Sequence, residues 1–345
     1  MATVAKWARF GLALGSLLLA PAVVAERAVH AAAPIRGPLN VLLVGIDPRN
    51  DHTAPLADSI IVAHVTADRT GAYLFSLPRD LIVAIPAFPT SGSAARRDKI
   101  NAAMALGSRV GPGRYSAAQG YELLARTVGA VTGITRFDAG AVLNFRGFTR
   151  LVDAVGGLSM PVDQNVVSEH RKPDGRPRDR IRQCPGHDDC HRPYTGPQKV
   201  YPKSAKPVHF RGWEALDYAR QRYGLPRSDY DRQRHQRQML KALAKKLKRT
   251  VLTSPATLLK VTATVGTSLT FLGGGHSLAD WATELKTLHL TEMTTIGLPG
   301  GPLFENKAYR GEQLPATTRD FFTAVTTDRV AGFLKTHPTT VTVDG

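Results

Sequence analysis

The stretch LNVLLVGID, residues 39–47, is an apolar run of the kind that forms a buried β-strand, and it ends in a carboxylate. Two similar runs follow, DSIIVAHVTAD at residues 58–68 and AYLFSLPRD at residues 72–80. A proline ends the third run and leaves Arg79 and Asp80 at its end. In α/β sheets, ligands bind at strand ends, where loops gather polar groups around a crevice. These three strands therefore predict a polar site at one edge of an α/β sheet.

The rest of the chain alternates helical and extended patterns. Apolar residues at helical spacing predict helices over residues 115–130, 148–155, 212–219 and 231–249. Short extended runs predict strands at residues 158–162, at RQRY (220–223) and near 294–298. Residues 168–208 are polar, basic and rich in Pro and Gly, which predicts an exposed loop. No repeat or second composition boundary occurs, so we expect one α/β domain over residues 38–345.

The positive charge is concentrated in one region. The formal net charge is +17, and residues 170–250 hold 22 Lys/Arg against 8 Asp/Glu, so the rest of the chain is close to balanced. Such a region suits an anionic partner, such as phosphate groups or an anionic membrane surface, although a solvated basic loop would give the same count. Aromatic residues make up only 7% of the chain, which argues against binding nucleic acid through stacked bases. We expect no nucleic-acid partner.

The N-terminus predicts export from the cytoplasm. Lys6 and Arg9 precede sixteen uncharged, mostly apolar residues, 10–25. This length lies between a signal-peptide core and a full membrane span of about 20 residues. We expect a cytoplasmic N-terminus (1–9), a retained signal-anchor in the cell membrane (10–28), a linker (29–37) and an extracytoplasmic domain. A cleaved signal and a secreted protein is the alternative.

Cys184 and Cys190 are the only cysteines, and they lie in the stretch CPGHDDC. Two cysteines six residues apart in a loop of an exported protein predict a small disulfide. Histidines and aspartates lie between and beside them, so a metal site is the alternative. Zinc sites usually supply two paired sets of ligands, and no second set is visible. The disulfide is therefore the favoured interpretation.

The helix that begins near Asp229 carries polar residues on an otherwise apolar face. Arg232 and Gln236 share that face with three leucines further along. Buried polar groups are costly unless paired, so these two either line an anion pocket at the helix N-terminus or pair with an acid such as Asp229. In an extended RQRY segment, Arg220 and Arg222 would project from one face. They could grip a diphosphate or form an ordinary exposed pair.

The acidic residues of the predicted site are Asp47, Asp58 and Asp80. Carboxylates at adjacent strand ends beside a phosphate site suit Mg²⁺, a hard cation that prefers oxygen ligands and substrate phosphates. The sequence contains no HExxH, Walker loop or GxSxG motif. Mg²⁺ is therefore the predicted cofactor.

Taken together, these segments resemble the LytR-CpsA-Psr family of cell-wall glycopolymer transferases. The resemblance spans residues 39–243, about 60% of the chain, and implies a mixed central β-sheet flanked by helices, an α/β/α fold. Seven motifs carry it in chain order: LNVLLVGID, ADSIIVAHV, FSLPRD, DKINAAMALG, FRGFTRLVDAVGGLSMPV, HFRGWEALDYARQRY and SDYDRQRHQRQMLKAL.

The resemblance also implies a site. Family members bind a polyprenyl pyrophosphate, with the lipid in a hydrophobic tunnel and the pyrophosphate against arginines. On the matching motifs, the pyrophosphate-binding residues are Arg79, Lys99, Arg220, Arg222, Arg232 and Gln236. Asp47 and Asp58 match the Mg²⁺-binding aspartates, and Asp229 or Asp80 is the candidate catalytic base beside Arg79. The implied reaction moves a glycopolymer from its polyprenyl-pyrophosphate carrier onto peptidoglycan or a related wall polymer, and releases polyprenyl phosphate.

Two positions depart from the family pattern. Leu56 stands where many members have an arginine, so one expected phosphate contact is missing. His235 stands where many members have a second helical arginine. A neutral histidine would weaken anion binding, although its titration near pH 6.5 could relay protons.

Two rival functions fit the same residues. One is a lipid-linked polymer carrier or regulator that binds without turnover. The retained carboxylates argue against it, because pure anion binding would gain from their removal. The other is a pyrophosphatase that uses water as acceptor, and the sequence does not distinguish it from the transferase.

Overall fold

The central sheet is built from apolar strands whose two faces are both buried. In a computed structural model of the chain, which describes residues 35–48, 52–181, 194–250, 259, 261, 263–286 and 293–344, strand β1 spans Leu39–Ile46. Leu42 and Val44 face one hydrophobic core, and Val41 and Leu43 face another on the opposite side. Burial on both faces explains why this strand reads as a continuous apolar run.

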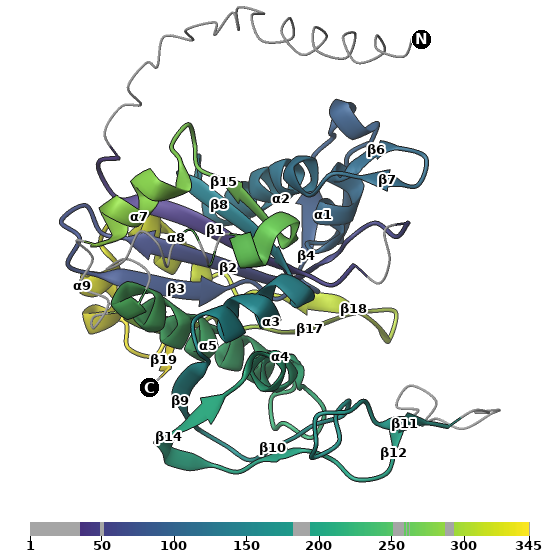
Figure 1. The fold of residues 1–345 in the computed structure, drawn as a ribbon. Helices are drawn as coiled ribbons and strands as arrows, with labels where there is room; N and C mark the ends of the chain where they lie inside the picture. The colour runs from purple at the N-terminus through teal and green to yellow at the C-terminus, as the bar shows by residue number, and fades with distance from the viewer. Residues whose placement is uncertain are drawn as a thin grey trace, which may run out of the picture. The chain divides into compact units, whose positions relative to one another are not determined.

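Within the described residues, seven strands form a mixed sheet in the order β15-β8-β1-β2-β3-β16-β19 (Figure 1). The other six strands are β2 (Ala57–Val65), β3 (Ala72–Ser76), β8 (Ala139–Asn144), β15 (Leu269–Leu272), β16 (Met293–Gly297) and β19 (Thr342–Asp344). β1 is antiparallel to β2 and parallel to β8, and β3 is antiparallel to β2 and parallel to β16. The predicted fold class, a mixed sheet flanked by helices, is confirmed.

Helices cover both faces of the sheet (Figure 1). One group packs on the core that includes Leu42; it is α1 (Ala102–Gly107), α2 (Ala117–Thr132), α8 (Thr318–Thr326) and α9 (Val330–Thr336). The helices of the opposite face are α3 (Phe145–Ala154), α4 (Gly212–Arg220), α5 (Asp229–Thr250) and α7 (Leu278–Lys286). The α2 helix ends at Thr132, where Gly133 adopts the left-handed conformation (φ 75°) that closes a helix C-terminus.

The prediction of an exposed loop over residues 168–208 is wrong in part. The described residues there form short strand pairs: β9 (Leu158–Val162) with β14 (Ser204–Phe210), β10 (Val166–Val167) with β13 (Val200–Tyr201), and β11 (Asp179–Arg180) with β12 (Tyr194–Thr195). These pairs lie on the far side of α4 and α5 from the sheet (Figure 1). Tyr201 and Phe210 pack there with Tyr218 of α4 in a second core. A few aromatic residues thus anchor a segment whose composition is otherwise that of a loop.

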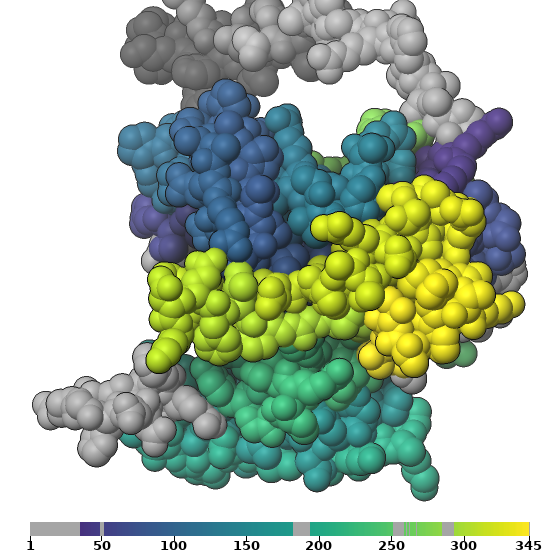
Figure 2. Space-filling model, turned by 180° about the vertical axis from the view of Figure 1, so that it is seen from behind, coloured from purple at the N-terminus to yellow at the C-terminus, as the bar shows by residue number. Residues whose placement is uncertain are grey.

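A hairpin of β17 (Gly301–Glu305) and β18 (Ala308–Gln313) crosses the side of the molecule seen from behind (Figure 2). It lies between the region of α1 and α2 and the β9–β14 region. Glu312 of this hairpin accepts a hydrogen bond from Tyr230 of α5 at 2.7 Å. The remaining short strands are β4 (Ile82–Ile85), β5 (Arg96–Lys99), β6 (Arg109–Gly111) and β7 (Arg114–Tyr115).

The prediction of an N-terminal membrane anchor and the prediction of a disulfide both concern residues that the structure does not describe. The chain divides into two units, Met1–Pro34 and Ile35–Gly345, and the predicted anchor over 10–28 belongs to the first. Cys184 and Cys190 also lie outside the described residues. Among the residues that are described, no helix has the length and apolar character needed to cross a bilayer.

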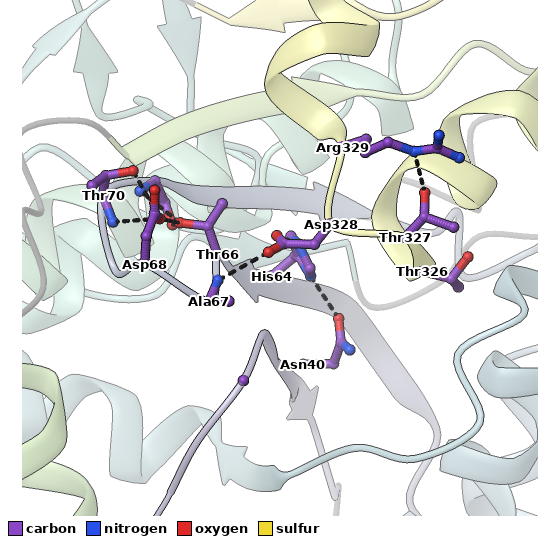
Figure 3. A network of polar contacts seen from close by, with 12 residues as sticks. Asn40, His64, Thr66, Ala67, Asp68, Thr70, Thr326, Thr327, Asp328 and Arg329 are labelled. Atoms are coloured by element: carbon purple, nitrogen blue, oxygen red, sulfur yellow. Dashed lines mark hydrogen bonds and ion pairs between the residues drawn. The ribbon is translucent and has the colours of Figure 1, made fainter.

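A polar network ties the turn between α8 and α9 to the sheet (Figure 3). His64 of β2 is completely buried, and its Nε2 donates to Asp328 Oδ1 at 3.0 Å. Its Nδ1 lies 3.0 Å from Asn40 Oδ1 on β1, and the Ala67 amide donates to the other Asp328 oxygen. Burial lowers the pKa of His64 below its ordinary value, although Asp328 opposes this shift. The network therefore holds a neutral imidazole at neutral pH.

This network predicts a loss of stability in mild acid. Because the pKa of His64 is lower in the folded than in the unfolded protein, the unfolded state binds the extra proton as the pH falls below about 6.5. The free energy of unfolding should then fall by up to about 1.4 kcal/mol per pH unit more than in His64→Gln, which has no proton to gain there. Urea titrations of both proteins between pH 7 and pH 5 test this, and parallel pH profiles would contradict it.

Candidate functional site

A cavity of about 1110 Å³ gathers most of the predicted site residues. Its wall takes side chains from β2, from the segments after β1 and β3, and from α4 and α5. Of the predicted residues, it contains Asp47, Asp58, Arg79, Arg220, Arg222, Arg232 and Gln236. Asp47 and Asp58 come together because β1 and β2 are antiparallel, with Ile46 opposite Ala57. Three polar residues at the predicted strand ends, Asp47, Asp58 and Arg79, therefore lie together in one cavity.

Arg79 is the centre of an ion-pair cluster at one end of this cavity. Its Nη1 donates to Asp58 Oδ1 at 2.5 Å, and its Nε lies 3.6 Å from Asp80 Oδ2 and 4.0 Å from Asp229 Oδ1. Lys99 of β5 pairs with Asp80 at 2.9 Å. Lys99, Asp80 and Asp229 are not among the residues that line the cavity. Asp80 and Asp229 flank Arg79, and the side chain of each is about one-fifth exposed.

Arg220 and Arg222 both line the cavity, but the predicted RQRY strand does not form. Arg220 is the last residue of α4, and the chain then turns at Gly224, whose φ is 74°. The helix continues through Arg220 because Gln221, its C-cap, donates from its amide to the backbone oxygen of Asp217 at 2.7 Å. Arg220 pairs with Asp47 at 3.3 Å, and the Arg222 guanidinium lies over the Tyr223 ring.

Of the polar residues at the start of α5, Arg232 pairs with an acid and also lines the cavity, so the two interpretations of this face are compatible. Arg232 is buried and donates to Asp229 Oδ2 at 3.1 Å, with Asp229 Oδ1 at an ion-pair distance of 2.9 Å. It also lines the cavity with Gln236. Burial would raise the pKa of Asp229, but the guanidinium groups of Arg232 and Arg79 outweigh it and hold this pKa below its usual value. Asp229 is therefore ionised, and it orients both arginines.

Two guanidinium nitrogen atoms of the cluster lack a hydrogen-bond partner within the described residues. The Nε atoms of Arg79 and Arg232 are buried and donate no hydrogen bond within the described residues. Unsatisfied buried donors are costly, and donors with positive charge favour an anion as partner. The cavity wall is therefore built to accept negatively charged oxygen atoms.

The residues also fit the predicted metal. Asp47 and Asp58 bring two carboxylates to one cavity, and within the described residues no group of three His, Cys, Asp or Glu side chains forms a protein-only metal site. Mg²⁺ is commonly held by one or two carboxylates together with substrate phosphates, so two carboxylates in an anion-binding cavity suit it.

A second, apolar cavity of about 310 Å³ meets the first. It lies between β1, β8, α3, α4 and α5, and its wall includes Leu43, Leu151, Leu240, Leu243 and Leu247. Phe145, Arg220 and Gln236 line both cavities. The face of α5 that carries Leu240, Leu243 and Leu247 therefore runs from the cationic cavity into the apolar one.

Sequence analysis missed part of the cavity wall. Glu169, His170, Arg180 and Tyr194 line it, and they come from the segment predicted as an exposed loop. Phe145 opens the FRGF motif and lies 4.4 Å from the Arg220 guanidinium carbon, a contact that its place in the motif did not reveal.

The two departures lie in different environments. Leu56 lines the cavity and is 44% exposed, so the position where many family members have arginine is indeed at the site. His235 is fully buried against Tyr218, with Nε2 3.3 Å from Asp163, and it does not line the cavity.

The fold and site together define an α/β/α protein with an arginine-lined cavity joined to an apolar one. The chain belongs to the LytR_cpsA_psr family, whose model matches residues 22–320. Among solved structures, a Streptococcus agalactiae protein, gbs0355, has the same fold, with a TM-score of 0.64 and 21% identity over 85% of this chain and 88% of that one. TagT in complex with LI-WTA has a TM-score of 0.58 and 21% identity, covering 87% and 94%.

Curated relatives match more locally. Biofilm regulatory protein A of Streptococcus mutans is 27% identical over 61% of this chain and 44% of its own length. The polyisoprenyl-teichoic acid–peptidoglycan teichoic acid transferase TagU of Bacillus cereus is 28% identical over 61% and 52%. Cell wall biosynthesis protein LcpA of Corynebacterium glutamicum is 28% identical over 73% and 44%. The chain thus spans about half the length of the curated relatives that it matches.

Proposed function

We propose that this chain transfers a glycopolymer from a polyprenyl-pyrophosphate carrier onto peptidoglycan or a related wall polymer. The observation that carries the proposal is the junction of the two cavities at Phe145, Arg220 and Gln236. An apolar cavity that opens directly onto several arginines matches an amphiphile with an anionic head on an apolar chain. The names of TagU and LcpA support the same activity.

In this proposal, the lipid occupies the apolar cavity and the pyrophosphate lies against Arg79, Arg220 and Arg232. Positioning and charge neutralisation dominate phosphoryl transfer, and the protein supplies them through these guanidinium groups. Asp47 and Asp58 would hold Mg²⁺, which when bound neutralises charge on the phosphate oxygens.

The bonds that change follow from the donor's chemistry. A hydroxyl oxygen of the wall acceptor forms a bond to the sugar-side phosphorus, and the bond from that phosphorus to the bridging oxygen breaks. The lipid phosphate leaves with the bridging oxygen, and a carboxylate takes the hydroxyl proton. Asp80 and Asp229 are the candidate bases, and both lie within 4.0 Å of Arg79.

A direct assay tests the function. The full chain, incubated with a polyprenyl-pyrophosphate-linked saccharide and a wall fragment, should release polyprenyl phosphate and attach the saccharide to the fragment. Release without attachment would favour a pyrophosphatase, and binding without release would favour a carrier. We further propose that the domain works outside the cytoplasm, tethered to the cell membrane, and cell fractionation tests this part separately.

Arg220→Ala is expected to weaken binding of the lipid pyrophosphate by roughly ten- to a hundredfold. The substitution removes a charge-assisted contact worth about 1.5–3 kcal/mol. Binding and turnover should fall together, because the lost contact holds the donor. Arg126→Ala is the matched control, since Arg126 is half exposed on α2, pairs with Glu122, lies over the Phe88 ring and does not line the cationic cavity. If calorimetry gave equal affinities for the two variants, Arg220 would not be a pyrophosphate-binding residue.

A further inference from the structure

A side cavity of about 310 Å³ branches from the cationic cavity toward the β11–β12 strand pair. Four residues, His170, Arg180, Tyr194 and Arg220, line both cavities. The side cavity is therefore continuous with the proposed pyrophosphate site. It leads away from the apolar cavity, with which it shares only Arg220 and Leu216.

The side cavity is rich in unpaired positive charge. Arg171, Arg178 and Arg180 line it, and none of them forms an ion pair with a carboxylate of the described residues. Arg178 is more than nine-tenths buried, and its Nε is without a hydrogen-bond partner. The one carboxylate of the wall, Asp217, is buried and already accepts hydrogen bonds from Ser168, Tyr201 and Gln221. The partners that the three arginines do have are neutral oxygen atoms: Arg171 donates to the Gly175 carbonyl, Arg178 to the carbonyls of Glu169 and Gly196, and Arg180 to the Tyr194 hydroxyl. An incoming anion would thus compete with no carboxylate ion pair of the described residues.

Flat aromatic surfaces form the rest of this wall. The Trp213 indole packs on the backbone of Gly175, whose φ is 87° and where a Cβ atom would come within 2.9 Å of the ring. Only glycine fits there, so this turn fixes the indole from one side. Tyr194 lies between Arg180, 5.2 Å from its ring centre, and His170, at 5.1 Å. Both rings are therefore held in place before any ligand arrives.

His170 stands between the two cavities as a neutral group. Burial lowers its pKa to about 4, and the neighbouring Arg220 adds to the shift. Its buried Nδ1 has no hydrogen-bond partner within the described residues. A neutral imidazole with one open nitrogen suits a hydroxyl group better than a phosphate.

We propose that the side cavity binds an anionic sugar unit of the transferred glycopolymer, one that bears a phosphate or a carboxylate. Aromatic faces contact the sugar ring, the arginines bind its charged group, and His170 meets a hydroxyl at the junction with the pyrophosphate site. This inference rests on the proposed function and adds the chemical class of polymer. It also gives a role to the basic segment with Arg171, Arg178 and Arg180, which is separate in the sequence from the predicted pyrophosphate-binding residues.

Trp213 gives a local signal for a binding test that requires no turnover. The full chain is titrated with N-acetylglucosamine 6-phosphate, glucuronic acid, neutral N-acetylglucosamine and inorganic phosphate, and tryptophan fluorescence is compared with that of Trp213→Phe. At least one charged sugar should change the Trp213 signal and bind at least tenfold tighter than the neutral sugar and inorganic phosphate. A response to the phosphorylated sugar or to glucuronic acid identifies which charged group the polymer carries.

Arg171→Gln should weaken that binding by about tenfold, whereas Arg171→Lys, which keeps the charge, should lose less. Arg176→Gln is the matched control, because Arg176 lies in the same segment, is exposed and pairs with Asp174. If Arg171→Gln lowers the melting temperature, Arg180→Gln repeats the test at an exposed position. Equal affinity for neutral and charged sugars, or unchanged binding in these variants, would overturn the proposal. A protein that binds a charged sugar but releases no polyprenyl phosphate would instead refute the proposed transfer and leave the sugar site standing.

Discussion

Asp58→Asn is expected to reduce glycopolymer transfer by about a hundredfold or more while lipid-pyrophosphate binding survives. Asp58 lines the cationic cavity and pairs with Arg79 at 2.5 Å. Loss of one preorganised electrostatic group commonly costs about 10²–10³ in turnover. The substitution also removes a negative charge that competes with the substrate for Arg79, so the affinity for the donor should hold or increase. Turnover and binding should therefore separate in this variant, unlike in Arg220→Ala.

The test runs a turnover assay beside a binding titration, each with and without Mg²⁺. Asp68→Asn is the control, because Asp68 lies in the turn at the opposite end of the β2–β3 hairpin and is bonded to Thr66 and Thr70. Its turnover should match that of the parent protein. Nearly full turnover by Asp58→Asn would dismiss a catalytic or metal-binding role for Asp58. A parallel loss of binding would mean that Asp58 acts by positioning Arg79.

Arg237→Met should destabilise the fold by about 3–5 kcal/mol, the range for breaking a buried ion pair from one side. Arg237 of α5 is 2% exposed, and its Nη2 and Nε donate to Asp344 Oδ2 of β19 at 2.7 and 2.8 Å. Asp344 Oδ1 is buried and has no other partner within the described residues. Loss of the arginine would thus leave a whole carboxylate uncompensated in the core.

Urea denaturation measures this loss. The double variant Arg237→Met/Asp344→Leu should recover much of the stability, since an apolar pair of similar volume is often as stable as a buried ion pair. Arg136→Met, which breaks an exposed pair with Asp138, should cost less than about 1 kcal/mol. A single variant within about 0.5 kcal/mol of the parent protein would show that the Arg237 pair does not stabilise the fold.

The strands and their polar ends could be predicted because each signal is local. The apolar run of β1 and the Asp or Arg at one end of each strand need no knowledge of distant residues, and the structure brings Asp47, Asp58 and Arg79 to one cavity. The periodicity of α5 likewise places Arg232 and Gln236 on the face that lines the cavities.

Residues 158–162 form β9 as the sequence predicts, but β14 and its pairing with β9 could not be predicted, for the opposite reason. β9 and β14 are joined by pairing between residues about 40–50 positions apart, such as Leu158 with Phe210, and polar intervening residues hide that pairing. Glu169, His170 and Arg180 reach the site only through this long-range arrangement. The composition that indicates a loop says nothing of where its side chains point. The RQRY error is of the same kind, because α4 extends through Arg220 to its C-cap Gln221, whose side chain donates to Asp217 and accepts a hydrogen bond from the distant Glu169 amide.

The shared wall of the two main cavities has a consequence for polymers of different length. Phe145, Arg220 and Gln236 fix the boundary between apolar and charged surroundings at one point along the donor. Under the proposed function, the donor is therefore positioned by its lipid end. The reactive phosphorus then reaches the same position whether few or many sugars follow. Chain length is then set by whatever builds the polymer, and this protein attaches each finished chain without counting its units.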